Sequence, residues 1–204
     1  RSAPPRLPFA GFPVEIPLRS TLGEPAEEDT YMPHSYRKME SPVGTLTLVA
    51  RDDAFLVAIL WQHERPNRVP LDEMRLSEDS SLLAETERQL REYFSGKRSR
   101  FELPLDFQGT EFQKKVWSAL LTIPFGETRS YTEIAVQIGS PNAVRAVGAA
   151  NGRNPLSIVA PCHRVIGASG GLTGFAGGLA AKQWLLRLET RGRTPDLLSM
   201  IEDE

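Results

Sequence analysis

The sequence predicts a mixed α/β (α+β) fold: a small amino-terminal sheet domain with one helix, then a mostly helical carboxy-terminal domain containing a helix-turn-helix. Three observations support this prediction. Two apolar runs between residues 46 and 61 flank a charged turn, as in a β-hairpin. A helix start follows at Ser80. Beyond Gly109 the apolar residues recur at helical spacing, and two short helical segments meet near Gly139.

Composition divides the 204 residues into four expected segments. The first 35 residues hold seven of the sixteen prolines and show no hydrophobic period, which is typical of an extended arm. We therefore expect an arm at 1–35, an α/β domain at 36–106, a helical domain with the candidate site at 107–193, and an acidic tail at 194–204.

The hairpin is predicted from a strand-like run at 46–49 and a second apolar run at 54–61. Residues 51–53, Arg-Asp-Asp, supply the turn between them, and a further turn at 41–44 precedes the first strand. Residues 62–79 are polar and contain proline, so we expect a loop there.

The first helix is expected to begin at Ser80 or Ser81 and to end near Phe94, with Gly96 beyond its end. Its apolar residues Leu83, Leu90 and Phe94 share one face. The opposite charges of Glu87 and Arg91, four residues apart, favour the helix.

The carboxy-terminal half begins with a capping box, in which Thr110 caps a helix whose third residue is Gln113. This helix is expected to bury Phe112, Val116 and Leu120 and to stop before Pro124. Further elements follow from similar signals: a helix at 132–138, a helix at 140–150 that starts with Ser-Pro, a strand-like run at 157–160, a glycine-rich loop at 167–178, and a last helix at 179–189.

Composition excludes several classes of protein. The single cysteine rules out an intrachain disulfide and any zinc site built from several cysteines, and His34, His63 and His163 are scattered. The sequence therefore gives no indication of a metal cluster. No apolar run reaches the ~18 residues of a membrane span, and no secretion signal is recognisable. We expect a cytoplasmic protein, or a nuclear one in a eukaryote.

The charge is uneven along the chain. Residues 111–193 carry ten basic and four acidic side chains, whereas the whole chain has a net charge of −2. A basic segment between acidic ones is consistent with a surface that binds an anion such as nucleic acid. Chance clustering on solvated faces is the alternative, and charge alone favours it.

The helix expected at 140–150 consists largely of alanine, valine and glycine, and Arg145 is its only charge. Small side chains let a helix approach another surface closely, and a DNA groove is one such surface. A helix packed tightly in the core is the alternative. Major-groove readers present several polar side chains to the bases, so a DNA-binding role for this helix would imply weak sequence specificity.

Cys162 and His163 stand between a short apolar run and a glycine-rich loop. A cysteine nucleophile reacts as the thiolate, so it needs a base, and a histidine oriented by a carboxylate can act as one through a bridging water. Glu189, at the end of an apolar helix, is a candidate carboxylate, and Asn154 could brace the following turn. A buried cysteine without chemistry, a solvated helix end and an ordinary loop asparagine are the alternatives.

These residues resemble the O6-alkylguanine-DNA alkyltransferase family. The resemblance rests on Pro-Cys-His-Arg-Val-Ile-Gly at 161–167, Asn-Pro at 154–155, Thr-Gly-Phe-Ala-Gly-Gly-Leu at 173–179 and Lys-Gln-Trp-Leu-Leu at 182–186. It covers residues 107–190, with a weaker match from Ser41 onward. The chain departs from the family at Phe175, where many members have tyrosine, and at Ser157, where the human member has proline.

The resemblance implies direct-reversal DNA repair: an alkyl group passes from guanine O6 in double-stranded DNA to Cys162, and the protein reacts once. It implies no metal or cofactor and a monomer, and it leaves O4-alkylthymine open as a second substrate. The implied catalytic residues are Cys162, His163, Glu189 and Tyr131. The implied substrate-binding residues are Asn154, Ser157, Val165, Phe175 and Ala176. The implied DNA-binding residues are Arg145, Thr132, Ser140, Ala146 and Gln113.

Three other functions compete with this one. A non-catalytic relative would bind alkylated DNA without reacting, but such proteins replace the cysteine that is present here at position 162. A helix-turn-helix regulator would need more polar side chains to read bases. A Cys-His hydrolase would turn over repeatedly, but its cysteine and histidine normally come from distant parts of the chain.

Overall fold

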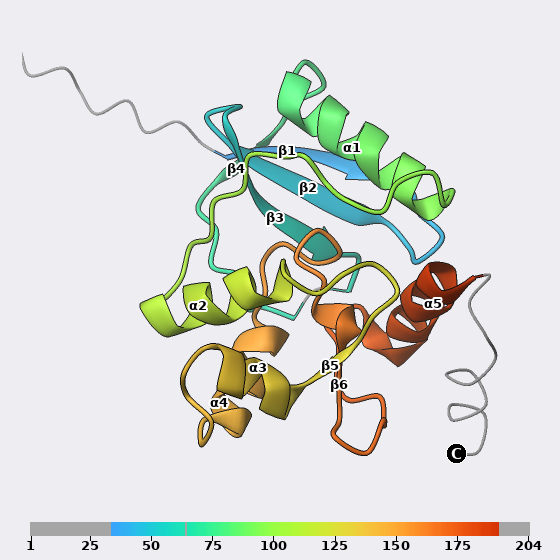
Figure 1. Ribbon diagram of the computed structural model, residues 1–204. Coiled ribbons are helices and arrows are strands. Elements are labelled where there is room, and N and C mark those ends of the chain that lie inside the picture. The colour runs from blue at the N-terminus through green and yellow to red at the C-terminus, as the bar shows by residue number, and fades with distance from the viewer. Residues whose placement is uncertain (1–33, 64, 192–204) are drawn as a thin grey trace, which may run out of the picture. The chain divides into compact units, whose positions relative to one another are not determined.

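The computed structural model describes residues 34–63 and 65–191 (Figure 1). They belong to one compact unit, Met32–Glu204. Most of the expected arm and the whole acidic tail lie outside the described residues. The predicted division of the body between residues 106 and 107 stays a prediction. None of the described helices is long and apolar enough to cross a membrane.

A four-stranded sheet begins the described chain, with the strand order β3-β2-β1-β4. β2 pairs antiparallel with both β1 and β3, and β4 pairs parallel with β1. The predicted hairpin is confirmed, and its turn places Asp52 and Asp53 at φ of 55° and 50°, a left-handed region that aspartate tolerates. The strands are β1 (His34–Met39), β2 (Leu46–Arg51), β3 (Phe55–Trp61) and β4 (Met74–Leu76).

Two strands of this sheet, the inner strand β1 and the edge strand β4, were not predicted. β1 replaces the end of the expected arm, and β4 interrupts the loop expected at 62–79. The β1 sequence, HSYRKM, does not alternate between apolar and polar residues, and β4 has only three residues, all exposed, which is too short for alternation to mark a strand. Both are held by backbone pairing, which leaves no signal in side-chain type.

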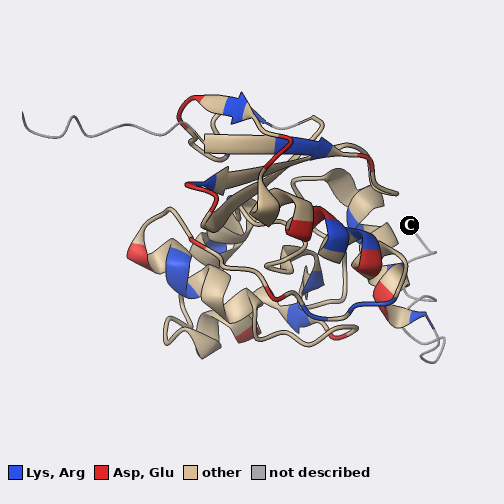
Figure 2. Ribbon diagram, turned by 90° about the horizontal axis from the view of Figure 1, so that it is seen from above, with Lys and Arg blue, Asp and Glu red and all other residues tan. Residues whose placement is uncertain are grey.

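The predicted first helix is confirmed as α1 (Ser81–Phe94), with the Ser80 side chain accepting a hydrogen bond from the Leu83 backbone N–H. α1 packs on the sheet and contributes Leu83, Leu90 and Tyr93 to the core shared with β2 and β3. Its outer face carries alternating acidic and basic side chains (Figure 2), including the expected ion pair of Glu87 with Arg91 at 2.6 Å.

The second half is mostly helical, as predicted. Three helices, α2, α3 and α4, pack together around a second buried cluster that also holds Cys162. The predicted capping box of Thr110 and Gln113 is present, although Phe112 is only half-buried. The elements are α2 (Glu111–Leu120), β5 (Arg129–Ser130), α3 (Tyr131–Gln137), α4 (Val144–Gly152), β6 (Val165–Ile166) and α5 (Gly178–Thr190).

The predicted start of the helix at Ser140 is wrong, because α4 begins at Val144. Ser140 and Pro141 instead open a turn, in which the Ala143 N–H donates to the Ser140 carbonyl at 2.9 Å. Proline after serine suits the second position of such a turn as well as the first turn of a helix. The helix-turn-helix therefore consists of α3 and α4 with a six-residue connection.

Candidate active site

The strand expected at 157–160 is also wrong: residues 154–161 form a tight turn. Ile158 has a φ of 74°, and the Ala160 N–H donates to the Leu156 carbonyl at 2.8 Å. The Asn154 amide spans the turn, donating to the Ala160 carbonyl at 2.8 Å and accepting from the Leu156 N–H at 3.1 Å. A side-chain amide satisfies backbone groups that a strand would pair with a neighbour, so the apolar run can turn back on itself.

Cys162 follows this turn, at the start of a short 3-10 helix, Cys162–Arg164. Its side chain is only 2% exposed. Burial raises the pKa of the Cys162 thiol, while a hydrogen bond with Asn154 and the positive charges of Arg68 and Lys182 oppose that rise. The sulfur therefore rests as a thiol and needs a base before it can attack.

His163 lies next to Glu189, which α5 brings to the same place from 26 residues downstream. His163 Nε2 is 2.8 Å from Glu189 Oε1, and both side chains are fully buried. Burial lowers the pKa of His163 and outweighs the hydrogen bond with Glu189, so the imidazole is neutral. When Nε2–H donates to Glu189, Nδ1 carries the free electron pair, and Nδ1 has no hydrogen-bond partner within residues 34–63 and 65–191.

Glu189 is held from several sides. Arg164 donates through Nε to Oε2 at 2.8 Å and through Nη2 to Oε1 at 2.9 Å, and the Gly126 N–H donates to Oε2 at 3.1 Å. Burial raises the pKa of Glu189, but the hydrogen bonds and charges of His163 and Arg164 outweigh it and hold that pKa well below its usual range. Glu189 is thus a buried carboxylate, and its position at a helix end is explained by these partners.

Sequence reasoning missed three side chains that touch this site. Lys182 is fully buried and donates to the carbonyls of Val165 and Thr173. Arg68, from the loop after β3, donates to the backbone carbonyl of Asn154 at 2.5 Å. Tyr93, on α1, donates to Glu189. Two of the three come from the amino-terminal half, where no motif links them to Cys162, so only the fold brings them here.

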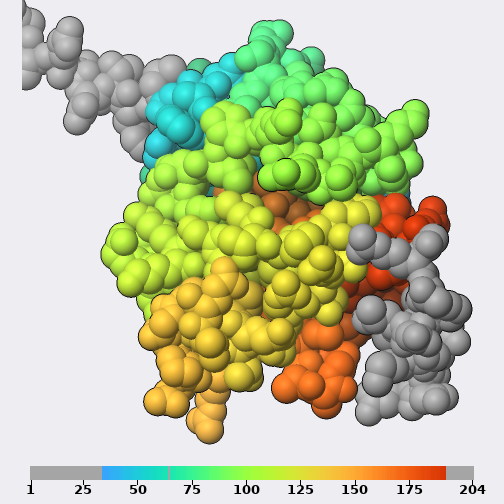
Figure 3. All heavy atoms as spheres, in the orientation of Figure 1, coloured from blue at the N-terminus to red at the C-terminus, as the bar shows by residue number. Residues whose placement is uncertain are grey.

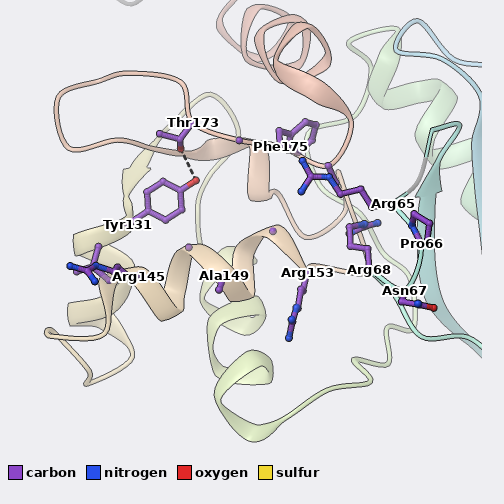
Figure 4. Close-up of a pocket in the computed structure, with 15 residues that line it drawn as sticks. Arg65, Pro66, Asn67, Arg68, Tyr131, Arg145, Ala149, Arg153, Thr173 and Phe175 are labelled. Carbon is purple, nitrogen blue, oxygen red and sulfur yellow. Dashed lines mark hydrogen bonds between the residues drawn. The ribbon is translucent and has the colours of Figure 1, made fainter.

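A cleft of about 710 Å³ lies beside this site (Figure 4). Its walls come from three places: the loop after β3, the helix-turn-helix, and the glycine-rich loop before α5. In Figure 3 the helix-turn-helix and the glycine-rich loop are seen as separate gold and orange lobes. The lining has four arginines and no acidic residue. The lining residues are Arg65, Pro66, Asn67, Arg68, Tyr131, Val144, Arg145, Gly148, Ala149, Gly152, Arg153, Thr173, Gly174, Phe175 and Ala176.

Three of the predicted substrate and catalytic residues line the cleft: Tyr131, Phe175 and Ala176. The Tyr131 hydroxyl is 2.8 Å from Thr173 Oγ1, which joins α3 to the glycine-rich loop (Figure 4). The remaining residues of both sets are buried and do not line the cleft: Cys162, His163, Glu189, Asn154, Ser157 and Val165. Cys162 and Val165 nevertheless belong to the buried cluster against which Tyr131 and Phe175 pack.

Ser157 supports the wall of the cleft from behind. Its Oγ accepts a hydrogen bond from Trp61 Nε1 at 3.1 Å, and the Trp61 ring packs edge-on against Phe175 at 5.3 Å. Trp61 is on β3, so the amino-terminal sheet supports one wall of the cleft.

The predicted DNA-binding residues are spread more widely. Arg145 is exposed and lines the cleft. Ala146 and Thr132 are exposed but are not among its lining residues, and Ser140 is half-buried in the turn before α4. Gln113 lies on α2, where its side chain closes the capping box with Thr110. The structure therefore brings Arg145 and Tyr131 to one cleft and does not bring Gln113 there.

The sequence of this chain matches the models of a known protein family. Residues 35–107 match the ribonuclease-like domain of 6-O-methylguanine DNA methyltransferase, and residues 111–191 match the DNA-binding domain of the same protein. The chain belongs to the O6-methylguanine DNA methyltransferase family. The family and the mixed fold predicted from the sequence are both confirmed.

Members of this family are similar over most of the chain. A methylated-DNA–protein-cysteine methyltransferase of Mycolicibacterium paratuberculosis is 50% identical over 168 residues, which cover 82% of this chain and 98% of that protein. The one from Methanosarcina barkeri is 48% identical over 154 residues, covering 76% and 96%. A crystal structure of Mycobacterium tuberculosis OGT in complex with DNA has 47% identity and a TM-score of 0.71, covering 81% and 98%.

Proposed function

We propose that this member of the family repairs O6-alkylguanine in double-stranded DNA by transferring the alkyl group to Cys162. The observation that carries the proposal is the buried Cys162, His163 and Glu189 behind a cleft lined by four arginines. The activity named for its relatives, methyl transfer from methylated DNA to a protein cysteine, matches this site.

His163 activates the thiol in this mechanism. Nδ1 takes the Cys162 proton through a water, and the buried Glu189 carboxylate stabilises the imidazolium that forms. The attraction between the imidazolium and the Glu189 carboxylate is much stronger in this buried site than it would be in water. Deprotonation thus occurs when substrate is present, although burial raises the resting pKa of Cys162.

The thiolate then displaces guanine from the alkyl carbon. The S–C bond forms as the C–O6 bond breaks, and the electron pair of that bond stays on the guanine. The guanine takes up one proton, which His163 returns, so ordinary guanine is restored. We propose that Tyr131 donates a hydrogen bond to the leaving base. The product is a thioether without a good leaving group, so each molecule reacts once.

The cleft supplies the approach of DNA. Chemistry on a base requires that it leave the stack, which costs a few kcal/mol. The exposed guanidinium of Arg145 can take the vacated space, and the small residues Gly148 and Ala149 let the helix lie close in the minor groove. Minor-groove binding carries little sequence information, which suits repair at any sequence.

As the resemblance to the family implies, we also propose a monomer, and from the sequence we propose that it acts in the cytoplasm. Asn154 holds the turn before Cys162, and the backbone at Val165 and Ala176 faces the base edge. Thr132, Ser140, Ala146 and Gln113 remain proposed DNA contacts. Ser157 and Phe175 shape the pocket that sets which alkyl groups, and whether O4-alkylthymine, are accepted.

The test is a mass measurement. The protein is incubated with a duplex containing one O6-methylguanine, and the intact mass and a digest are then recorded. We expect one methyl group per molecule, located on Cys162, with guanine restored and no further turnover.

The Cys162→Ala variant is the matched control, and it should bind the duplex without gaining mass. If the wild-type protein binds the lesion duplex tightly but its mass stays constant, the chain is a lesion-binding protein and the proposed reaction is wrong. Release of many product molecules per protein would instead indicate a hydrolase.

A further inference from the structure

Tyr93 reaches the active site from the other half of the molecule. It is on α1, on the face that carries Leu83, Leu90 and Tyr93 into the core, near the end of the helix closest to α5 in Figure 1. Its side chain is fully buried. Its ring packs against Phe94, Phe101 and Phe125, with centroids 5.4–6.0 Å apart.

The Tyr93 hydroxyl is aimed at the pair formed by Glu189 and His163. It donates to Glu189 Oε1 at 2.5 Å and is 3.5 Å from His163 Nε2. Burial and the charge of Glu189 raise the pKa of Tyr93 well above its usual value, so the hydroxyl keeps its proton and can only donate to the carboxylate. A buried hydroxyl is costly unless it is hydrogen-bonded, and phenylalanine would fill the same ring space without that cost.

Oε1 of Glu189 therefore receives three donors: Tyr93 OH, Arg164 Nη2 at 2.9 Å and His163 Nε2 at 2.8 Å. The first two donors fix this oxygen in place opposite the imidazole. They also share the negative charge of Oε1, so less of that charge acts on His163. Glu189 therefore raises the pKa of His163 less than it would without these two donors. His163 thus stays neutral at rest but faces an oriented carboxylate when it takes a proton.

We propose that Tyr93 is a positioning residue for alkyl transfer, which holds Glu189 against His163 and makes the amino-terminal sheet domain part of the proton relay. This inference rests on the proposed function. The Tyr93 ring has a structural role in the core, whereas its hydroxyl serves the reaction. The two roles can be separated because Tyr93→Phe removes the hydroxyl alone.

The test compares Tyr93→Phe with the wild-type protein and with Tyr36→Phe, a matched change of a half-buried tyrosine on β1. The single-turnover rate of methyl transfer from a saturating O6-methylguanine duplex is measured between pH 5 and 9, together with duplex affinity. For Tyr93→Phe we expect unchanged affinity and a rate about tenfold lower at neutral pH. Tyr36→Phe should match the wild type.

The pH profile provides a readout that a purely structural role would not change. The charged groups that face His163 are Glu189, Arg164 and Lys182, and all are kept in the variant. Without the Tyr93 donor, more of the negative charge of Glu189 acts on His163, so the pKa of His163 should rise. We expect the acid limb of the rate profile, and the imidazole titration followed by NMR, to move to higher pH.

A double-mutant cycle guards against general destabilisation. Tyr93→Phe should have little further effect on the rate in a Glu189→Gln background, because the hydroxyl acts through that carboxylate. An unshifted or downward-shifted pH profile, or rate effects that simply add, would overturn the inference. If the wild-type protein itself transfers no methyl group, the proposed function has failed instead.

Discussion

The Lys182 ammonium group lies 2.6 Å from the carbonyl oxygen of Val165 and is buried. It also donates to the Thr173 carbonyl at 3.1 Å, so one cation joins β6 to the glycine-rich loop that forms a wall of the cleft. Burial lowers the Lys182 pKa to about 8, and the nearby Cys162 opposes this. The cation therefore ties the glycine-rich loop to β6, which begins three residues after Cys162.

Replacing Lys182 with methionine should weaken both functions of the cation. The buried carbonyl of Val165 and the partly buried carbonyl of Thr173 lose their donor, so we expect a loss of about 1–3 kcal/mol in the free energy of unfolding. The pKa of Cys162 should rise further, because a positive charge that opposes the rise is removed. Chemical unfolding and the pH dependence of thiol alkylation measure the two effects. The exposed Lys97→Met change should produce neither, and equal effects in both variants would contradict this account.

Acid should destabilise the protein through His163 and Glu189. Both have pKa values lowered in the folded state, so the unfolded chain binds more protons as the pH falls. The stability that each contributes is present above its unfolded pKa, about 6.5 for histidine and about 4.3 for glutamate, and is lost as the pH falls further. We expect the free energy of unfolding to decline first near pH 6.5 and again below about pH 5.

The Glu189→Gln variant isolates the second part of this decline. The neutral amide of this variant cannot balance the charge of Arg164, so we expect a loss of about 3–5 kcal/mol at pH 7, the usual cost of leaving one buried partner of an ion pair. The difference from the wild type should shrink as the pH falls through the titration of Glu189. Urea unfolding at a series of pH values gives both quantities. A difference that is constant with pH would show that Glu189 is not an ion-pair partner.

The sequence pointed to Cys162, His163 and Asn154 through a local pattern, and to Glu189, 26 residues after His163, through its place at the end of an apolar helix. Cys162 and His163 are adjacent, and Asn154 is eight residues away, so a local motif reveals them. Tyr93 and Arg68 act through long-range contacts, and their own surroundings in the sequence carry no signal for this role. Lys182 stands in a segment that carries the resemblance, but its contacts with the carbonyls of Val165 and Thr173 become visible only in the fold. In the sequence, Tyr93 looks like an ordinary core residue of a helix, and Arg68 looks like a residue of an exposed loop.

The same division applies to the fold. The hairpin and α1 combine apolar periodicity with clear turn or capping residues, and both were predicted. β4 is a short exposed strand held by backbone pairing to β1, so its side chains did not mark it. The short apolar run at 157–160 predicts a strand, and only the contacts of Asn154 in the structure show that the backbone turns there.

Gly177 should tolerate no side chain. A Cβ at this position would lie 2.6 Å from the Trp61 ring, which supports Phe175 and binds Ser157. We expect Gly177→Ala to cost about 1–3 kcal/mol of unfolding free energy, as overpacking does, and to slow methyl transfer by displacing the cleft wall. Gly152→Ala is a suitable control, because nothing lies within 4 Å of its Cβ and alanine favours a helix. Equal thermal stabilities of the two variants would contradict the prediction.

The arginines of the cleft should contribute to DNA affinity through phosphate contacts. Arg65 lines the cleft from the amino-terminal half, and its side chain is exposed. Replacing it with glutamine should weaken binding to every duplex alike and reduce the slope of log affinity against log salt by about 1, the effect of one lost phosphate contact. Arg91→Gln, on the outer face of α1, is the matched charge change and should leave the slope unaltered. Titrations from about 50 to 200 mM salt, with and without the lesion, measure it. If Arg65→Gln keeps the wild-type slope, DNA does not reach the amino-terminal wall of the cleft.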